Sequence, residues 1–262
     1  MPCVMRIKMK IVSFNIRCAW IETVKSEINS FIHRAGMIYD KLRAERPEIV
    51  AFQEIKEPME QFLRRALSDI YDFHMFYRSE NYDGEGLLLA TLKGSVAVDG
   101  LERFWLSPTP NVPGSRFPEQ STCPRIAVVA ECREIASGRI VRVCNLHLDH
   151  ISDEARVLGM QIVLGRLEEL EAARHLPTVI LGDFNARPDS EPIALCHKSP
   201  LGLVDTTESL PVTFHDYGSR DIKIDYIFAT KDLAECVTEV GVWDDCHAGI
   251  YLSDHYPIFV EV

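Results

Sequence analysis

The sequence predicts an α/β fold in which helices cover layers of β-structure. An apolar run at residues 8–14 precedes a helical segment at 28–46, and a second strand follows at 48–53. This strand–helix–strand order is typical of α/β layered folds. The 262 residues, 47% of them hydrophobic, can bury a large core. Since no linker, low-complexity segment or fixed-period repeat interrupts the sequence, we expect one domain over residues 1–262.

Apolar periodicity and turn residues predict the remaining elements. Pro47 stops the first helix, and Pro58 opens a second helix at 58–68, because proline is tolerated in a first helical turn. Ser152 can cap a long helix that reaches about Arg174. A short helix is expected at 191–197, and strands are expected at 73–77, 86–92, 95–104, 125–133, 140–148, 178–181, 223–229, 239–243 and 257–262.

The formal net charge of −11 restricts the classes of partner. Long, tight tracking along nucleic acid usually needs a basic face, which this composition disfavours. Nucleic acid is still a possible substrate, because acidic side chains around a divalent metal can present a locally positive surface to phosphate. We see no obligate protein partner in the sequence.

The chain is expected to be cytoplasmic and without a membrane span. Its longest apolar runs are too short to cross a bilayer, and charges at residues 1–8 stand where a signal peptide needs an apolar core. None of the eight cysteines lies in a Cys-x-x-Cys pair, and Cys132, Cys144 and Cys236 lie in apolar, strand-like runs. We therefore expect reduced cysteines, several of them in the core, rather than disulfides or a zinc site.

Polar side chains recur in, or just beyond, six of the apolar runs. Rigid strands position such groups accurately, so strand ends in α/β folds commonly build functional sites. The six residues are Asn15, Glu54, His147, Asp183, Asp225 and Asp254.

The run at 178–181 leads into the most informative of these positions. If the chain stays extended after it, Asp183 and Asn185 point to one face and Phe184 to the other. Residues 145–150 also alternate, which predicts that Leu146 and Leu148 face the core and that His147 lies on the opposite face. A half-exposed strand is the ordinary interpretation of that second pattern, and a catalytic histidine is the functional one.

Asp225 stands among β-branched and aromatic residues, where an uncompensated carboxylate is costly. Two interpretations are open. The carboxylate forms a buried ion pair, for example with Arg220 or Lys223, or it orients a histidine as in many acid–base sites.

Six short motifs, taken together and in chain order, resemble those of the endonuclease/exonuclease/phosphatase superfamily. This group includes DNase I-like nucleases, AP endonucleases, sphingomyelinases, inositol polyphosphate 5-phosphatases and deadenylases. The motifs lie at residues 13–15, 52–54, 145–148, 182–185, 223–227 and 253–255. Stretches at 104–110, 113–115 and 124–127 are similar to an uncharacterised bacterial and fungal branch that lies nearer the deadenylase-like members than the AP endonucleases.

The resemblance implies a four-layer α/β sandwich: two mixed, mainly antiparallel sheets packed face to face with helices outside. It also implies phosphoester cleavage that depends on Mg²⁺ or Mn²⁺. Glu54 would be the main metal ligand, with Asn15 and Asp254 close to the metal. Oxygen ligands of this kind suit a hard cation.

The same resemblance implies a catalytic role for each remaining polar residue. Asp183 would orient or deprotonate the attacking water, and Asn185 would hold a non-bridging phosphate oxygen. His255, polarised by Asp225, would bind the phosphoryl group, and His147 would contact the phosphate or assist the leaving group. Phosphoryl transfer needs an oriented water, charge neutralisation and help for the leaving group, so the set is chemically coherent.

The substrate is less well defined by the sequence. Arg125 either binds phosphate bidentately or closes an edge strand, and Trp105 either stacks on a base or sugar or packs in the core. Glu85 matches the branch, but the apolar run after it indicates a different substrate-facing wall. We expect a phosphodiesterase or phosphatase acting on small phosphoesters or short nucleic-acid ends. The alternatives are a sequence-nonspecific DNA or RNA nuclease and, less favoured, a catalytically inactive binding module.

Overall fold

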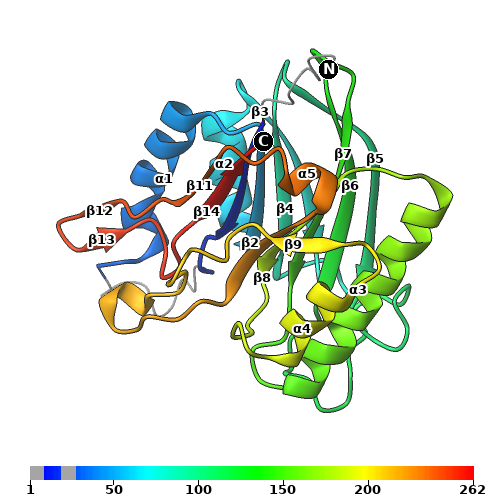
Figure 1. The fold of residues 1–262 in the computed structure, drawn as a ribbon. Coiled ribbons are helices and arrows are strands. Elements are labelled where there is room, and N and C mark those ends of the chain that lie inside the picture. Colours follow the sequence, from blue (N-terminus) through cyan, green and yellow to red (C-terminus); the bar gives the residue numbers. More distant parts are fainter. Residues whose placement is uncertain (1–8, 19–27) are drawn as a thin grey trace.

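The computed structural model describes residues 9–18 and 28–262, and in them two six-stranded sheets pack face to face. Helices cover the outer face of each sheet, so four layers run α–β–β–α (Figure 1). The α/β sandwich expected from the sequence is therefore confirmed.

The first sheet has the strand order β11-β14-β1-β2-β4-β3. Its central pair, β1 and β2, is parallel, and its other pairs are antiparallel. The strands are β1 (Lys10–Asn15), β2 (Ile49–Lys56), β3 (Tyr71–Tyr77), β4 (Glu85–Leu92), β11 (Glu239–Val242) and β14 (Ile258–Glu261).

The second sheet has the order β5-β6-β7-β8-β10-β9, and its central pair, β7 and β8, is again the parallel one. Both sheets thus direct the carboxyl ends of a parallel pair toward the site described below. The strands are β5 (Val96–Trp105), β6 (Ile126–Glu134), β7 (Ile140–His147), β8 (Thr178–Asp183), β9 (Leu203–Asp205) and β10 (Asp225–Thr230).

The helices divide between the two sheets. Helices α1 (Phe31–Glu45) and α2 (Glu57–Leu67) pack on the first sheet, whereas α3 (Asp153–Ala173) and α4 (Glu191–Lys198) pack on the second. The Ser152 hydroxyl accepts a hydrogen bond from the Ala155 amide at 3.2 Å, which confirms the cap predicted for α3. The short α5 (Lys231–Ala234), a 3-10 turn (Asp216–Gly218) and a hairpin of β12 (Cys246–His247) and β13 (Ile250–Tyr251) complete the elements in the described residues.

Side-chain alternation builds separate cores on the two faces of each sheet. On β1, Ile11 enters the core between the sheets, and Val12 enters the core beneath α1 and α2. On β8, Leu181 lies between the sheets and Ile180 packs beneath α3. At roughly 25 cal/mol per Å² of apolar surface removed from water, these cores are the main stabilising term.

The predicted elements are present with shifted ends, and a few short ones were not predicted. Strand β8 extends to Asp183, two residues beyond the expected 178–181 run. The expected start of the first strand at residue 8 lies outside the described residues. Strands β9, β12 and β13 and helix α5 have two to four residues each, too few to produce a periodic pattern.

Two findings bear on the compartment and the cysteines. Over the described ranges, no helix combines the length and apolar character that crossing a bilayer demands. The seven cysteines there are free, and Cys132 and Cys144 are buried in strands. The strand assignment was wrong for Cys236, which follows α5 in a turn that no ladder includes.

Candidate active site

The site forms where the two parallel strand pairs end. Asn15 is the last residue of β1, His147 of β7 and Asp183 of β8. His147 and Asp183 are register partners, and Asp225, the first residue of β10, pairs with Asp183 from the other side. The side chains therefore converge because the sheets hold their Cα atoms in fixed relative positions.

Glu54 reaches the same point through a β-bulge. The register of β2 against β4 shifts between Phe52 and Ile55, and Glu54 has a φ of 63°. A non-glycine residue in this left-handed region costs on the order of 1 kcal/mol, and bulges commonly redirect a side chain next to a functional site. The bulge turns the Glu54 carboxylate toward Asn15, whose Nδ2 donates to Oε1 at 3.2 Å.

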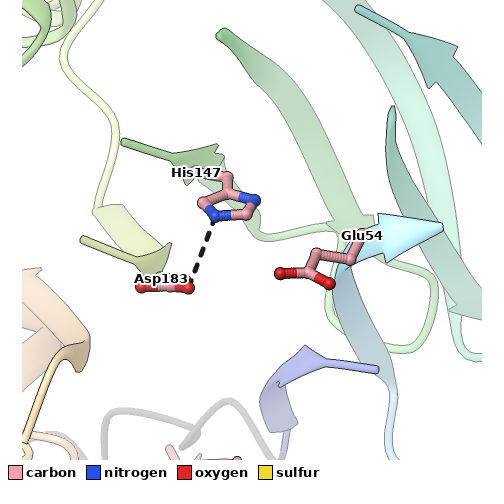
Figure 2. A group of neighbouring side chains, drawn as sticks. All are labelled: Glu54, His147 and Asp183. Carbon is pink, nitrogen blue, oxygen red and sulfur yellow. Dashed lines mark ion pairs between the residues drawn. The ribbon is translucent and has the colours of Figure 1, made fainter. Parts of the chain in front are cut away.

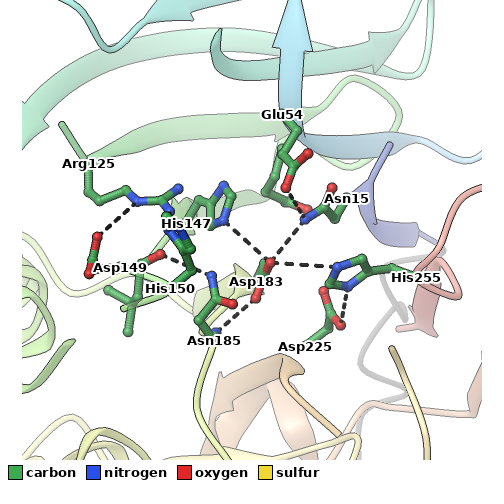
Figure 3. A network of polar contacts seen from close by, with 12 residues as sticks. Asn15, Glu54, Arg125, His147, Asp149, His150, Asp183, Asn185, Asp225 and His255 are labelled. Atoms are coloured by element: carbon green, nitrogen blue, oxygen red, sulfur yellow. Dashed lines mark hydrogen bonds and ion pairs between the residues drawn. The ribbon is translucent and has the colours of Figure 1, made fainter. Parts of the chain in front are cut away.

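Asn15 joins the two sheets at the site. Its Nδ2 also donates to Asp183 Oδ2 at 2.9 Å, while its Oδ1 accepts from the Arg17 amide at 3.0 Å. The Cys18 amide donates to the other Glu54 oxygen at 2.8 Å. Asn15 thus holds two carboxylates, one from each sheet, in a fixed relation (Figure 3).

Asp183 and Asn185 share a face, but for a different reason than the one predicted from sequence. The chain does not stay extended: Asn185 has a φ of 48°, and its amide donates to Asp183 Oδ1 at 2.8 Å. This is a side-chain-stabilised turn, which asparagine tolerates well. Phe184 is buried among Tyr226 and Phe228, as its predicted orientation requires.

Gly182 allows β8 to approach β7 at this turn. It has a φ of 144°, and a Cβ there would lie 1.9 Å from the Leu146 carbonyl oxygen. Any larger residue would push Asp183 away from His147. The glycine of the Gly-Asp-Phe-Asn motif is therefore required by backbone geometry.

Asp225 orients His255, which decides between the two interpretations open at the sequence level. His255 Nδ1 lies 2.8 Å from Asp225 Oδ2, and the Thr213 hydroxyl donates to the same oxygen at 2.7 Å. Lys223 pairs instead with Asp205 at 2.9 Å. The other ring nitrogen of His255, Nε2, faces Asp183 Oδ2 at 3.9 Å.

Burial and neighbouring charge set the protonation of these groups. Burial favours the neutral ring of His255, but Asp225, together with Asp183 and Asp254, outweighs it and raises the pKa of His255 to about 10. Burial and Asp225 together raise the pKa of Asp183 to about 7. Burial, then Arg125 and Arg78, holds the pKa of His147 well below its usual range.

A cavity of about 380 Å³ opens on this cluster. Glu54, His147, Asp183, Asn185 and His255 line it, and the Asn185 side chain is held by a hydrogen bond from its Nδ2 to the Leu148 carbonyl at 3.1 Å. These side chains therefore line one partly open cavity large enough for a small molecule.

Arg125 lines the same cavity just before β6. Its Nη2 lies 2.8 Å from His150 Nδ1 and its Nε lies 3.8 Å from Asp149 Oδ2. The side chain is only 4% exposed, yet Nε and Nη1 have no hydrogen-bond partner among the described residues. A guanidinium group that lines a cavity and keeps unpartnered N–H groups is suited to an anionic ligand.

Asp149 supports this wall from behind. Its carboxylate accepts from the amides of Ile151 and Ser152 at 3.0 and 2.8 Å and from the Ser121 hydroxyl. Burial opposes ionisation, but Ser121 and the backbone amides outweigh it and lower the pKa of Asp149. Trp105 is 3% exposed and donates to the Arg78 carbonyl at 2.7 Å, so it packs in the core rather than stacking on a substrate.

The structure places Asp254 at the edge of the cluster. Asp254 is buried and pairs with Arg17 (Oδ2–Nε 3.5 Å), and Arg17, not Asp254, lines the cavity. Arg17 also acts on Glu54: burial opposes ionisation of Glu54, but Arg17 and the Cys18 amide lower its pKa. Sequence reasoning missed Arg17, Arg78 and Thr213, because all three lie outside the six motifs and no sequence pattern marks them.

The donor set fits a hard divalent cation. Atoms of Glu54, His147 and Asp183 that could serve as ligands lie within 4.8 Å of one another, and all three side chains face a common space (Figure 2). The carboxylates of Asp183 and Asp225 are buried close together, and Asp225 raises the pKa of Asp183. A cation beside them would relieve that repulsion.

Solved structures of similar proteins share this architecture. An endonuclease/exonuclease/phosphatase from Bacteroides vulgatus is 26% identical with a TM-score of 0.87, covering 97% of this chain and 98% of that one. A mannosyl-6-phosphatase from Bacteroides thetaiotaomicron is 25% identical with a TM-score of 0.85 over the same shares. The human Nocturnin catalytic domain, solved with a bound sulfate, is 19% identical with a TM-score of 0.75, covering 98% of this chain and 94% of that one, and shows likeness of fold alone.

Fold and site together define a class: α/β-sandwich hydrolases that act on phosphoesters. Residues 12–255 match the model of the Endonuclease/Exonuclease/phosphatase family, and the chain belongs to that family. None of the curated proteins matches the sequence significantly.

Proposed function

We propose that this protein is a divalent-cation-dependent hydrolase that releases phosphate from small phosphomonoesters. The observation that carries the proposal is the placement of Asp183. Its carboxylate lies at the end of a small-molecule cavity, next to Asn15, His147 and His255.

Asp183 acts as the base toward the attacking water. A pKa raised to about 7 suits a group that must accept a proton near neutral pH. As the water oxygen bonds to phosphorus, the P–O bond to the alcohol breaks, and Asp183 takes one proton from the water. The alcohol oxygen must receive one proton in return, and His147, 3.4 Å from Asp183, is positioned to pass it on.

Charge on the phosphoryl oxygens is the second requirement of the reaction. Protonated His255, the Asn185 amide and the unpartnered N–H groups of Arg125 supply donors from three directions. Asp225 keeps His255 charged and correctly turned, so it contributes through the histidine.

Glu54 would hold the cation, with Asn15 beside it and Asp254 acting through Arg17. When bound, Mg²⁺ or Mn²⁺ supplies positive charge to the phosphoryl oxygens and to the water. The Asn15 amide nitrogen points to the Glu54 and Asp183 carboxylates, so its role is to keep their spacing.

Two observations favour small phosphomonoesters over nucleic acid. The cavity of about 380 Å³ matches a small molecule, and a solved structure 25% identical to this chain is a mannosyl-6-phosphatase. A net charge of −11 disfavours the long electrostatic footprint that a nonspecific nuclease needs.

A phosphoester panel with Mg²⁺ or Mn²⁺ tests the proposal. We expect hydrolysis of monoesters that exhaustive chelation abolishes and added Mg²⁺ or Mn²⁺ restores. Glu54→Gln should raise the cation concentration for half-maximal activity by about tenfold or more, because it removes a charged ligand. Lys41→Gln serves as the control, since it also changes one charge and Lys41, on α1, does not line the cavity.

Activity that survives chelation would contradict the role of Glu54. Faster cleavage of long DNA than of any monoester, collapsing steeply as salt rises, would instead establish the nuclease alternative.

A further inference from the structure

Arg78 and Glu85 form a wall of the cavity that the proposed chemistry does not use. They face each other where the connecting loop of the β3–β4 hairpin begins and ends, and the Arg78 amide donates to the Glu85 carbonyl at 3.1 Å. Their side chains pair at 2.5 Å (Nη2–Oε2), and each is only 12% exposed. An ion pair that merely closes a hairpin gains little from such burial, because desolvation opposes the attraction.

The pair lies beside the reacting groups. Arg78 is close enough to Arg125 and to His147 to lower the pKa of both, after burial. Glu85 contacts Cys18, where it adds to burial in raising the pKa of the thiol, and the Cys18 amide donates to the Glu54 carboxylate. The ion pair therefore borders the space between Arg125 on one side and Glu54 on the other.

Arg125 and Arg78 differ in the hydrogen-bond donors and charge that they can offer to a ligand. Arg125 keeps two buried nitrogen atoms, Nε and Nη1, without a hydrogen-bond partner in the described part of the chain, and its carboxylate neighbour Asp149 lies 3.8 Å away, so it retains donors for an anion. Arg78 is neutralised by Glu85. A ligand phosphate at the Arg78–Glu85 pair would be repelled by the Glu85 carboxylate. A ligand hydroxyl group, in contrast, can donate to that carboxylate and accept from the Arg78 guanidinium.

The wall is held rigidly. A Cβ at Gly86 would lie 2.1 Å from the Phe76 carbonyl oxygen, so β3 and β4 approach closely just beside the pair. On the other side, the indole of Trp105 donates to the Arg78 carbonyl. Polar groups on such a fixed backbone discriminate between ligands better than groups on a mobile loop.

We propose that Arg78 and Glu85 are specificity-determining residues that bind the hydroxyl groups of a polyol, such as the ring of a sugar phosphate, while its phosphoryl group lies at Arg125 and His255. The inference rests on the proposed hydrolase activity and adds the chemical class of the alcohol. Substrates with hydroxyl groups next to the ester are favoured, and flat apolar alcohols are not.

The test compares kcat/KM for mannose 6-phosphate, glucose 6-phosphate and glycerol 3-phosphate with that for p-nitrophenyl phosphate, all with Mg²⁺. The wild type should prefer at least one polyol phosphate after correction for leaving-group reactivity. In Glu85→Gln the ratio of polyol to aryl kcat/KM should fall about 10–100-fold, because a charged acceptor of buried hydroxyl groups is lost. Asp99→Asn, which breaks the exposed Asp99–Arg133 pair on β5 and β6, should leave the ratio unchanged.

A second variant guards against a folding defect. Glu85→Gln alone leaves the Arg78 charge unpaired, so the double variant Arg78→Gln with Glu85→Gln removes both charges, and thermal unfolding confirms that each protein is folded. A ratio that stays at the wild-type value in both folded variants overturns the proposal. A wild type that hydrolyses only the aryl ester overturns it too, but spares the hydrolase function, whereas hydrolysis of neither class with any cation refutes both.

Discussion

His147 and His255 lie on opposite sides of the same carboxylate, 3.4 and 3.9 Å from Asp183 Oδ2, yet their surroundings are opposite in charge. His255 contacts the carboxylate of Asp225, the first residue of β10. His147 faces Arg125 and Arg78 from the β6 and β3 side. Both residues are buried to the same extent, at 6% exposure, so burial alone cannot explain why the two pKa values shift in opposite directions.

The difference shows how one carboxylate can serve two tasks. On the His255 side, a permanent imidazolium can bind phosphoryl oxygens. On the His147 side, a neutral ring can accept and release a proton as the alcohol departs. The two histidines therefore differ because of their charged neighbours. Asp225 contacts His255, whereas Arg125 and Arg78 lie near His147.

Removing the shared group should have the largest effect. Asp183→Asn keeps the shape but removes the base for the water, so kcat should fall about 10³-fold or more, with thermal stability near that of the wild type. Steady-state kinetics on the best monoester measures it. Asp153→Asn at the exposed start of α3 is the matched control. An Asp183→Asn enzyme within tenfold of wild-type kcat would remove Asp183 from the chemistry.

Removing only the partner of His255 should reduce activity less than removing Asp183. Asp225→Asn removes the carboxylate that charges His255, and we expect kcat/KM to fall about 10²-fold. Asp205→Asn, which breaks the buried Lys223–Asp205 pair on neighbouring β9, is the control for loss of a buried ion pair. Equal losses of activity in both variants would mean that Asp225 acts only through stability.

The protonation difference itself can be measured without turnover. In metal-free protein, heteronuclear NMR of the imidazole rings should show His255 protonated at about pH 8, because its pKa is raised to about 10. His147 should be neutral at about pH 6.5, because its pKa lies well below the ordinary value. In Asp225→Asn the His255 pKa should drop while that of His147 changes little. Two rings that titrate together would refute the comparison.

Sequence patterns predicted most of the fold because long elements carry a strong periodic signal. The alternation at 145–148 correctly placed Leu146 and Leu148 beneath α3. Ser152 correctly marked a helix start. Short elements such as β9 were missed, since three residues cannot reveal a period.

The site was predicted as a set of residues but not as a set of contacts. The strand-end positions of Asn15, His147 and Asp183 could be read from apolar runs. The bulge at Glu54 and the left-handed Asn185 could not, because both arise from how neighbouring strands pair. Nor could the sequence indicate that Thr213 would hold Asp225, since that contact depends on a loop conformation.

The hydrogen bond from Asn15 to Asp183 joins residues 168 positions apart and links the two sheets. A second side-chain hydrogen bond also links the two sheets: Gln53 Nε2 donates to Asn145 Oδ1 at 2.9 Å. Contacts this distant in the chain close late in folding, because the entropy of the intervening loop must be lost first. The second sheet, whose strands all lie within residues 96–230, can thus gain most of its own structure before the side chains of the site meet. The rate at which activity recovers during refolding would then report the rate at which the two sheets dock.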